Sequence, residues 1–409
     1  LQPPIVTPMQ IRSPRPLIPY LLAGASLLAL ANAGTSGGET PTHQLLDTPG
    51  DPATTASSND GDTPSPVPAT VIRSRYGKLN LSTWASLIPA RVHSRVEWVW
   101  PVAEAMGARI DIQEGGRVVL LTSQERQSKV RRRASAIRRT VAAFDELLPW
   151  AAPSHVPTEA EHQIQAERLV FSDPEPVIII ACDAKDFETV QKILAGLQSE
   201  PEQSDPYGCD DLDRFVSVFV EEPEDVTRWV AGNALTHHLT RALLAERYGR
   251  LPEWFSEGLA CHIEKELTGR LSALPHRPKE LERTTADGWD RELKTRFRQD
   301  QQQSVSMAAL ARFRCLAWEE TTLSEATGLV AFLAEHHTSD FAPFTADLAM
   351  NVDLVCRGVQ TDGSVQSLEG TYLGQTAQGQ LLADHFGPGV LDECARSFRS
   401  GGRYRAPKN

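Results

Sequence analysis

Short apolar runs in the first half of the ordered chain predict β-strands. PVIIIACD (Pro176–Asp183) is continuously apolar and rich in β-branched residues, which is typical of a central strand. RVVLLTS (Arg117–Ser123) follows the turn signal Gly115-Gly116, and the segment Arg214–Glu221 alternates between apolar and polar positions. The pattern therefore predicts at least three strands before residue 222.

Helical spacing dominates the rest of the chain. Apolar residues of Gln124–Leu148 recur at three- and four-residue intervals, and from Glu224 onward nearly every segment has the same period. The basic run of the first helix is expected to be a solvated face; it comprises Arg131, Arg132, Arg133, Arg138 and Arg139. Strands followed by helices favour the α+β class, with a small β-sheet beside a mainly helical subdomain.

The N-terminal segment has the pattern of an export signal. Arg12 and Arg15 precede the apolar run Leu17–Leu30, and Ala31-Asn32-Ala33 provides a small-x-small cleavage site. The protein is therefore expected to be exported, periplasmic or extracellular, with an uncleaved membrane anchor as the alternative. The expected divisions are a signal peptide at 1–33, a disordered linker at 34–74, a small segment of uncertain fold at 75–116, the main domain at 117–400 and a tail at 401–409.

Charge and cysteine content narrow the possible functions. The chain has 41 Lys and Arg against 53 Asp and Glu, a formal net charge of -12, so sequence-independent nucleic-acid binding is not expected. Its 6 cysteines are scattered without a C-x-x-C pair; they permit disulfides but do not indicate a structural zinc site. The acidic stretch Ser204–Asp213 lacks the spacing of a calcium loop and is expected to be a solvated loop.

Two amphipathic helices joined by a short turn are predicted within Asn233–Glu264. The segment reads NALTHHLTRALLAERYGRLPEWFSEGLACHIE, with Gly249 as a stop for the first helix and Pro252 at the start of the second. His237 and Arg241 are one helical turn apart on a face that is otherwise apolar. This face is therefore predicted to be buried, with a charged residue in it.

This segment resembles the gluzincin-type, peptidase MA-like domains of exported bacterial proteins. There it reads approximately H-E-L-T-H-x-L-L and then L-P-x-W-L-x-E-G-L-A-x-Y. Outside the histidines the shared positions are Leu239-Thr240, Leu243-Leu244, Leu251-Pro252, Trp254 and Glu257-Gly258-Leu259-Ala260. LSEATGLVAFLAEH (Leu323–His336) and HFGPGVLDECARSF (His385–Phe398) are also similar, so the resemblance covers about Arg117 to Ser400. It implies a zincin-like fold.

The resemblance implies a zinc site in which two of four essential positions have changed. In such peptidases two histidines and a glutamate hold zinc, and a second glutamate is the general base. By position, His237 matches the first ligand and Glu257 the third. Arg241 stands in place of the second histidine and His238 in place of the catalytic glutamate. A guanidinium has no lone pair for a metal, so His237 and Glu257 are expected to be vestigial ligands.

The sequence thus predicts a catalytically silent, exported scaffold or binding module that needs no cofactor. Its partner would be an unidentified protein or peptide, not a nucleic acid, and a membrane only if the N-terminal segment is retained. Arg241 is predicted to form a bidentate ion pair with Glu257, replacing the charge of the metal. His238, at the general-base position, is expected to be non-functional.

Two other interpretations stay open. A working zinc-dependent metallopeptidase or metallohydrolase with a rearranged site would use His237, His238 and Glu257, with His262 as a further candidate ligand. Alternatively, the chain shares only the fold and has a structural or interaction role, because fold does not imply function. Cys261 and His262 are otherwise expected to be packing residues.

Overall fold

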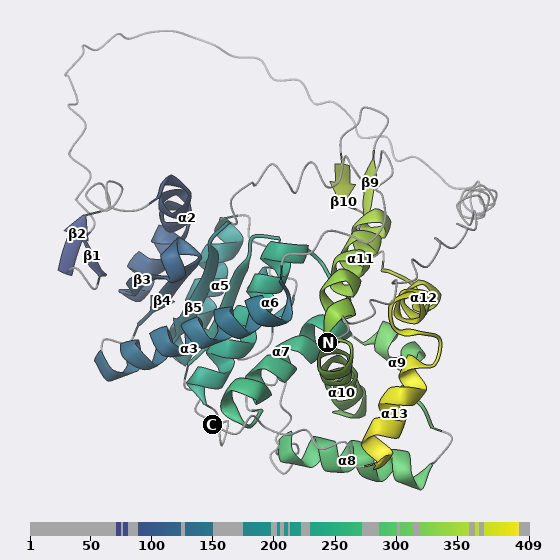
Figure 1. Cartoon of the computed structure of the whole chain (residues 1–409). Helices are drawn as coiled ribbons and strands as arrows, with labels where there is room; N and C mark the ends of the chain where they lie inside the picture. The colour runs from purple at the N-terminus through teal and green to yellow at the C-terminus, as the bar shows by residue number, and fades with distance from the viewer. Residues whose placement is uncertain are drawn as a thin grey trace, which may run out of the picture. The chain divides into compact units, whose positions relative to one another are not determined.

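A mixed β-sheet with helices on both faces is the central feature of the described structure (Figure 1). The structure is a computed structural model, and all of the described residues belong to one unit, Pro66–Asn409. The described ranges are 71–74, 77–80, 89–123, 127–149, 175–197, 203–204, 208–211, 213–221, 230–271, 286–300, 303–313, 320–359, 365–367 and 372–400.

The sheet has eight strands in the order β2-β1-β3-β4-β5-β8-β7-β6. Its centre is parallel, since β4 pairs with β5 and β5 pairs with β8 in the same direction, while β3 and β7 flank this centre antiparallel. The strands are β1 (Val71–Ser74), β2 (Gly77–Asn80), β3 (Arg109–Gln113), β4 (Val118–Thr122), β5 (Val177–Cys182), β6 (Gln203–Ser204), β7 (Gly208–Asp211) and β8 (Val216–Val220). Within the described residues, β9 (Arg357–Val359) and β10 (Val365–Ser367) form a separate hairpin.

Alternate residues of the central strands enter two different cores. Val118 and Leu120 pack with α3 (Gln127–Leu147) and α6 (Ala231–Tyr248), whereas Val119 and Leu121 pack with α2 (Ala90–Met106) and α5 (Ala184–Gly196). This follows from the two-residue period of a strand, which sends neighbouring side chains to opposite faces. β4 and β5 are apolar at almost every position because both of their faces are covered.

The remaining described helices form a subdomain that shares the core of α3 and α6. They are α7 (Glu253–Thr268), α8 (Ala286–Gln299), α9 (Met307–Arg312), α10 (Glu320–His336), α11 (Thr338–Cys356), α12 (Gln375–Phe386) and α13 (Val390–Ser400). The 3-10 turn η1 (Glu114–Gly116) joins β3 to β4. None of the described helices combines the length and apolar character needed to cross a membrane.

The α+β class and the three expected strands are confirmed. The segments that begin at Arg117, Pro176 and Arg214 contain β4, β5 and β8, and the helix expected from Gln124 is α3. The sheet extends further toward the N-terminus than residue 117, because β3 pairs with β4 and α2 packs beneath them. The expected linker also ends earlier than residue 74, since β1 pairs with β2 and β3.

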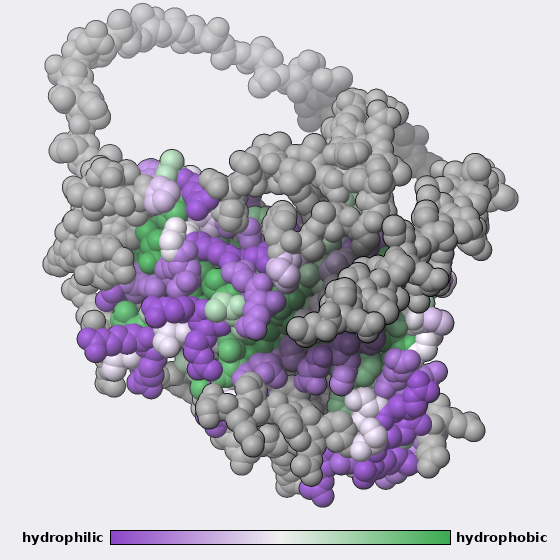
Figure 2. All heavy atoms as spheres, in the orientation of Figure 1, coloured by the Kyte–Doolittle hydropathy of each residue, from purple (hydrophilic) through white to green (hydrophobic). Residues whose placement is uncertain are grey.

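One sequence expectation about a charged segment is wrong, and another fails at a single residue. The stretch Ser204–Asp213 is not a solvated loop, because it contains the last residue of β6 and all of β7, and Asp210 and Asp211 are buried. The other arginines of the basic run on α3 are exposed, as expected, but Arg133 is buried and donates to Glu221. Hydrophilic residues are prominent on the surface along α3 in Figure 2.

Several expectations concern residues outside the described ranges. The signal segment 1–33, the linker up to residue 70 and the tail 401–409 belong to this group. Of the cysteines, Cys315 also lies outside. The five in the described ranges are buried, and no disulfide joins them.

Candidate functional site

The helix pair α6–α7 brings three of the predicted site residues together. α6 is followed by Gly249, whose φ of 69° is unfavourable for other residues, and α7 begins directly after Pro252. This tight connection lays the two helices against each other, with His237 and Arg241 on α6 facing Glu257 on α7. All three side chains are buried, and Glu257 is fully inaccessible to solvent.

Arg241 contacts two carboxylates that come from different parts of the fold. Its Nη1 donates to Glu257 Oε1, and its Nε lies 3.1 Å from Asp210 Oδ2 on β7. The guanidinium thereby links α6 to both α7 and strand β7 of the sheet. A guanidinium stays charged throughout the physiological pH range, so it compensates two buried carboxylates permanently.

His237 lies between two glutamates of α7. Its Nε2 is 3.2 Å from Glu257 Oε2 and its Nδ1 is 3.4 Å from Glu264 Oε2. Burial by itself would lower the pKa of His237, but hydrogen bonds with Cys261, Glu257 and Glu264 outweigh it, so the pKa of His237 is raised well above its usual value. His237 therefore contributes a second positive charge between the carboxylates.

Asn233 on α6 and Glu264 on α7 extend the same hydrogen-bond network. Asn233 Nδ2 donates to Glu264 Oε1 at 2.8 Å, and it also lies 2.9 Å from Thr268 Oγ1 and from the carbonyl oxygen of Arg270. These bonds fix the end of α7 to the start of α6. The sequence carried a signal for both residues, because Asn233 is four positions before His237 and Glu264 is seven positions after Glu257.

His238 points toward the sheet and is enclosed there. Its ring stacks on Phe219 with the centroids 5.3 Å apart, and its Nδ1 lies 2.8 Å from Ser217 Oγ and 3.3 Å from Asp210 Oδ1. Gly208 completes the enclosure, since a Cβ at that position would come within 2.9 Å of the imidazole. His238 is thus a packing residue that holds β7 and β8 against α6.

Asp210 is a site residue that the sequence reasoning missed. Burial alone would raise the pKa of its carboxyl group, but the charge of Arg241 and the hydrogen bonds from His238 and Ser217 lower it well below the ordinary range. Asp210 therefore remains ionised at any pH near neutrality. Its strand β7 has only four residues, which is too short to show a two-residue alternation in the sequence.

The donor set around His237 does not fit a zinc ion. Glu257 Oε1 accepts from Arg241, and the guanidinium occupies the position where a third ligand would be needed. His262 does not converge on this point, because it lines a cavity on the side of α7 that faces α10. Within the described residues no group of three or more His, Cys, Asp or Glu side chains has the arrangement to hold a metal ion.

Comparison of the sequence with protein-family models and with curated proteins gives no match. The function therefore has to be inferred from the site residues. Their chemistry consists of two buried cations, Arg241 and protonated His237, that are matched against three buried carboxylates, Asp210, Glu257 and Glu264. This arrangement neutralises charge inside the fold.

A second charge cluster lies at the C-terminal end of α6. Asp145 on α3 accepts from Arg117 at 2.7 Å and from Arg247 at 2.5 Å, and the Arg247 guanidinium lies 4.7 Å from the centre of the Phe144 ring. Burial raises the pKa of the neighbouring Glu246 to about 7, although the charges of Arg117 and Arg247 oppose the shift. Ionising Glu246 at neutral pH is therefore unfavourable in the folded protein.

Glu246→Gln is expected to stabilise the fold only at higher pH. Because its pKa is raised in the folded protein, Glu246 contributes most to stability below pH 4.5, and this stability is lost as the pH rises through 7. Urea unfolding gives the change in the free energy of unfolding that Glu246→Gln causes. This change should be more favourable at pH 8 than at pH 4.5 by on the order of 1–3 kcal/mol. Glu188→Gln, at an exposed position on α5, is the control. An equal effect of Glu246→Gln at both pH values would contradict the prediction.

Proposed function

We propose that this protein is a non-catalytic counterpart of the gluzincin-type zinc peptidases and acts as an exported scaffold or binding module. Three features support a zincin-like architecture: a mixed sheet, the antiparallel strand β7 next to the parallel centre of the sheet, and the helix pair α6–α7 that contacts it. The motif spacing His237, Arg241, Glu257 falls on the facing sides of that pair.

The observation that carries this proposal is the position of Arg241. In a working peptidase of this class, a histidine at this position would donate a lone pair to zinc, and Glu257 would be another ligand. Arg241 instead supplies a fixed positive charge to Glu257 and Asp210. Such a pair lets the helices pack as they would around a metal, because the buried carboxylates are compensated in both cases.

The position of His238 supports the same conclusion. A general base must reach a water held by the metal, within roughly 3 Å of its own nitrogen or oxygen. The His238 ring lies against Phe219 and Ser217, and its plane is turned by 71° from that of His237. A rearranged metallohydrolase would need His238 to converge with His237 and Glu257, but the Nδ1 of His238 lies against Ser217 and Asp210. His262, the further candidate ligand, lines a cavity elsewhere on α7.

The test is to restore the peptidase motif and measure bound zinc by elemental analysis. The variant Arg241→His with His238→Glu removes one positive charge and adds one negative charge, a change of −2 that a Zn²⁺ ion would balance. The expected result is that the natural chain binds no zinc and the double variant takes up close to one zinc per chain. The double variant should also gain thermal stability on addition of zinc, since ligand binding to the folded state stabilises it.

Two controls make the result decisive. The triple variant that also carries Glu257→Ala should lose the zinc, which would show that the metal is held at this site. If instead the natural chain holds stoichiometric zinc and loses it on His237→Ala, the proposal of a silent site is wrong. In that case a working metallohydrolase with a rearranged site would explain the molecule better.

A further inference from the structure

A partly enclosed cavity of about 310 Å³ lies on the side of α7 away from the charge network. α7 presents Glu257, Cys261 and Glu264 toward His237, while His262 and Lys265 lie on another face and line the cavity. The cavity walls come from α7, α8, α10 and α13. No step of the proposed function involves this space.

The inner end of the cavity offers hydrogen-bond donors. His262 and Lys265 are only 6% and 7% exposed, although both line the cavity. Burial, followed by the charge of Lys265, lowers the pKa of His262 to about 4, so at neutral pH the imidazole is uncharged and carries one N–H donor. The nearby hydroxyls of Ser324 and Thr327 donate to backbone carbonyls of α10. The inner end therefore suits a group that accepts hydrogen bonds and carries negative charge.

The walls of the cavity are aromatic. Trp289 on α8, Phe332 on α10 and Phe398 on α13 all line it. Gly328 allows these walls to come close, because a Cβ there would lie 2.8 Å from Leu293 Cδ1 and 3.0 Å from the Phe398 ring. A cavity near the lower limit of small-molecule sites accommodates one ring with a short side chain.

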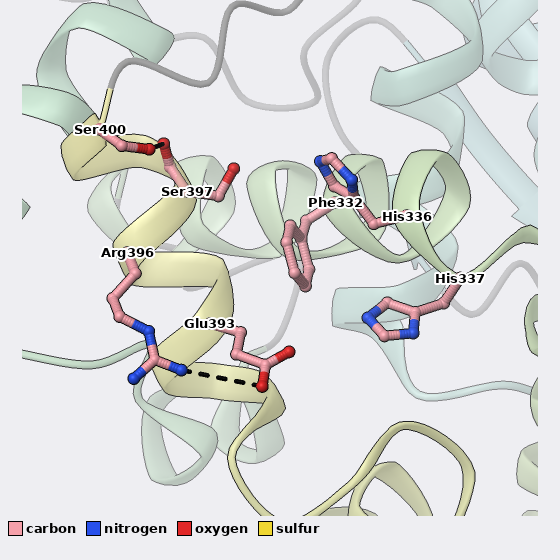
Figure 3. Close-up of a pocket in the computed structure, with 7 residues that line it drawn as sticks. All are labelled: Phe332, His336, His337, Glu393, Arg396, Ser397 and Ser400. Carbon is pink, nitrogen blue, oxygen red and sulfur yellow. Dashed lines mark hydrogen bonds and ion pairs between the residues drawn. The ribbon is translucent and has the colours of Figure 1, made fainter.

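The opening of the cavity is marked by its exposed lining residues, Glu335 and His336. A shallower hollow of about 490 Å³ adjoins it and shares Phe332, His336, Ser397 and Ser400. Figure 3 shows this hollow, where side chains of α10 lie opposite those of α13. The acidic lining residues, Glu335 and Glu393, are both exposed, and Glu393 lies 3.7 Å from Arg396 (Figure 3), whereas the cation at the inner end, Lys265, is buried.

We propose that this cavity binds a small aromatic carboxylate, with the carboxylate on Lys265 and His262 and the ring between Trp289, Phe332 and Phe398. The Lys265 ammonium has three N–H donors, so it can bind a carboxylate and keep a contact within the protein. A charge-assisted hydrogen bond in a site shielded from water is stronger than the same bond at the surface. The ring supplies apolar burial and edge-to-face contacts.

Isothermal titration calorimetry with phenylacetate on the full chain tests this proposal. The uncharged 2-phenylethanol and the cationic phenethylamine have the same ring and nearly the same length. Phenylacetate is expected to bind at least tenfold more tightly than 2-phenylethanol, and phenethylamine is expected to bind least. Lys265→Met should weaken phenylacetate binding at least tenfold, whereas Lys192→Met, at an exposed position on α5, should leave it unchanged.

A second variant keeps the proposal testable if Lys265→Met does not fold. Ala331→Phe places a ring in the cavity without removing a buried charge, and it should abolish phenylacetate binding in a chain that is folded by circular dichroism. The proposal is overturned if the folded natural chain does not bind millimolar phenylacetate. It is also overturned if the neutral alcohol binds as tightly as the carboxylate, or if neither variant weakens binding.

Discussion

Replacing Arg241 by methionine is expected to lower the free energy of unfolding by about 3–5 kcal/mol. The side chain is 5% exposed and lies between Glu257 and Asp210, which are both buried. Methionine has a similar length but no charge, so two carboxylates would lose their shared cation while remaining away from water. An uncompensated buried charge costs more than the ion pair contributes, and this difference accounts for the size of the expected effect. Urea unfolding at pH 7 measures it.

Two comparison variants separate charge from packing. Arg132→Met, on the exposed face of α3, removes the same group from the surface and should change stability by no more than about 0.5 kcal/mol. Adding Asp210→Asn and Glu257→Gln to Arg241→Met removes the uncompensated charges, so this triple variant should recover a substantial part of the loss. A loss below about 1 kcal/mol for Arg241→Met alone would contradict a central role for the ion pair.

The variant Arg241→Met should also be more sensitive to acid than the natural chain. The pKa of Asp210 is lowered in the folded protein, chiefly by the charge of Arg241 acting against burial. A lowered folded-state pKa contributes stability above the unfolded value of 3.8, and this contribution is lost as the pH falls through the folded-state pKa. Without Arg241, Asp210 would be protonated at a higher pH, so the acid unfolding midpoint of the variant should shift upward.

The sequence could predict the part of the site that lies on one pair of helices. The segments that contain His237, Arg241 and Glu257 have clear helical spacing. Because the turn at Gly249 is short, the two helices must be neighbours and pack against each other. The predicted ion pair between Arg241 and Glu257 followed from the ligand positions that the resemblance implies for them, together with the opposite charges of the two groups. The structure places these side chains in contact.

The part of the site contributed by the sheet could not be predicted in this way. Asp210 meets Arg241 only because β7 pairs with β8, and strand pairing is a non-local event that four residues of sequence do not encode. His238 was expected only to be non-functional, because its neighbours on α6 gave no sign that its ring would stack on Phe219. Arg133 was grouped with its basic neighbours for a similar reason, since its partner Glu221 is 88 positions away.

Gly258→Ala is expected to destabilise the protein by about 2 kcal/mol, the second largest effect predicted. Gly258 lies where α7 packs directly against the backbone of α10. A Cβ there would lie 2.9 Å from the carbonyl oxygen of Ala326 and 3.0 Å from Val330 Cγ2. The backbone of a helix cannot move aside as a flexible side chain can, so the two helices would have to separate. This cost exceeds the gain of about 1 kcal/mol that alanine brings in helix propensity.

Gly379→Ala on α12 is the matched control. Its added Cβ would lie 3.7 Å from Met307 Cγ, an ordinary contact, so only the propensity term should act. Denaturant unfolding should therefore show a gain of up to about 1 kcal/mol at Gly379 and a loss at Gly258. If both substitutions stabilise the chain, α7 and α10 do not pack at the distance described. Because α10 also lines the cavity beside Lys265, Gly258→Ala should in addition weaken phenylacetate binding, whereas Gly379→Ala should not.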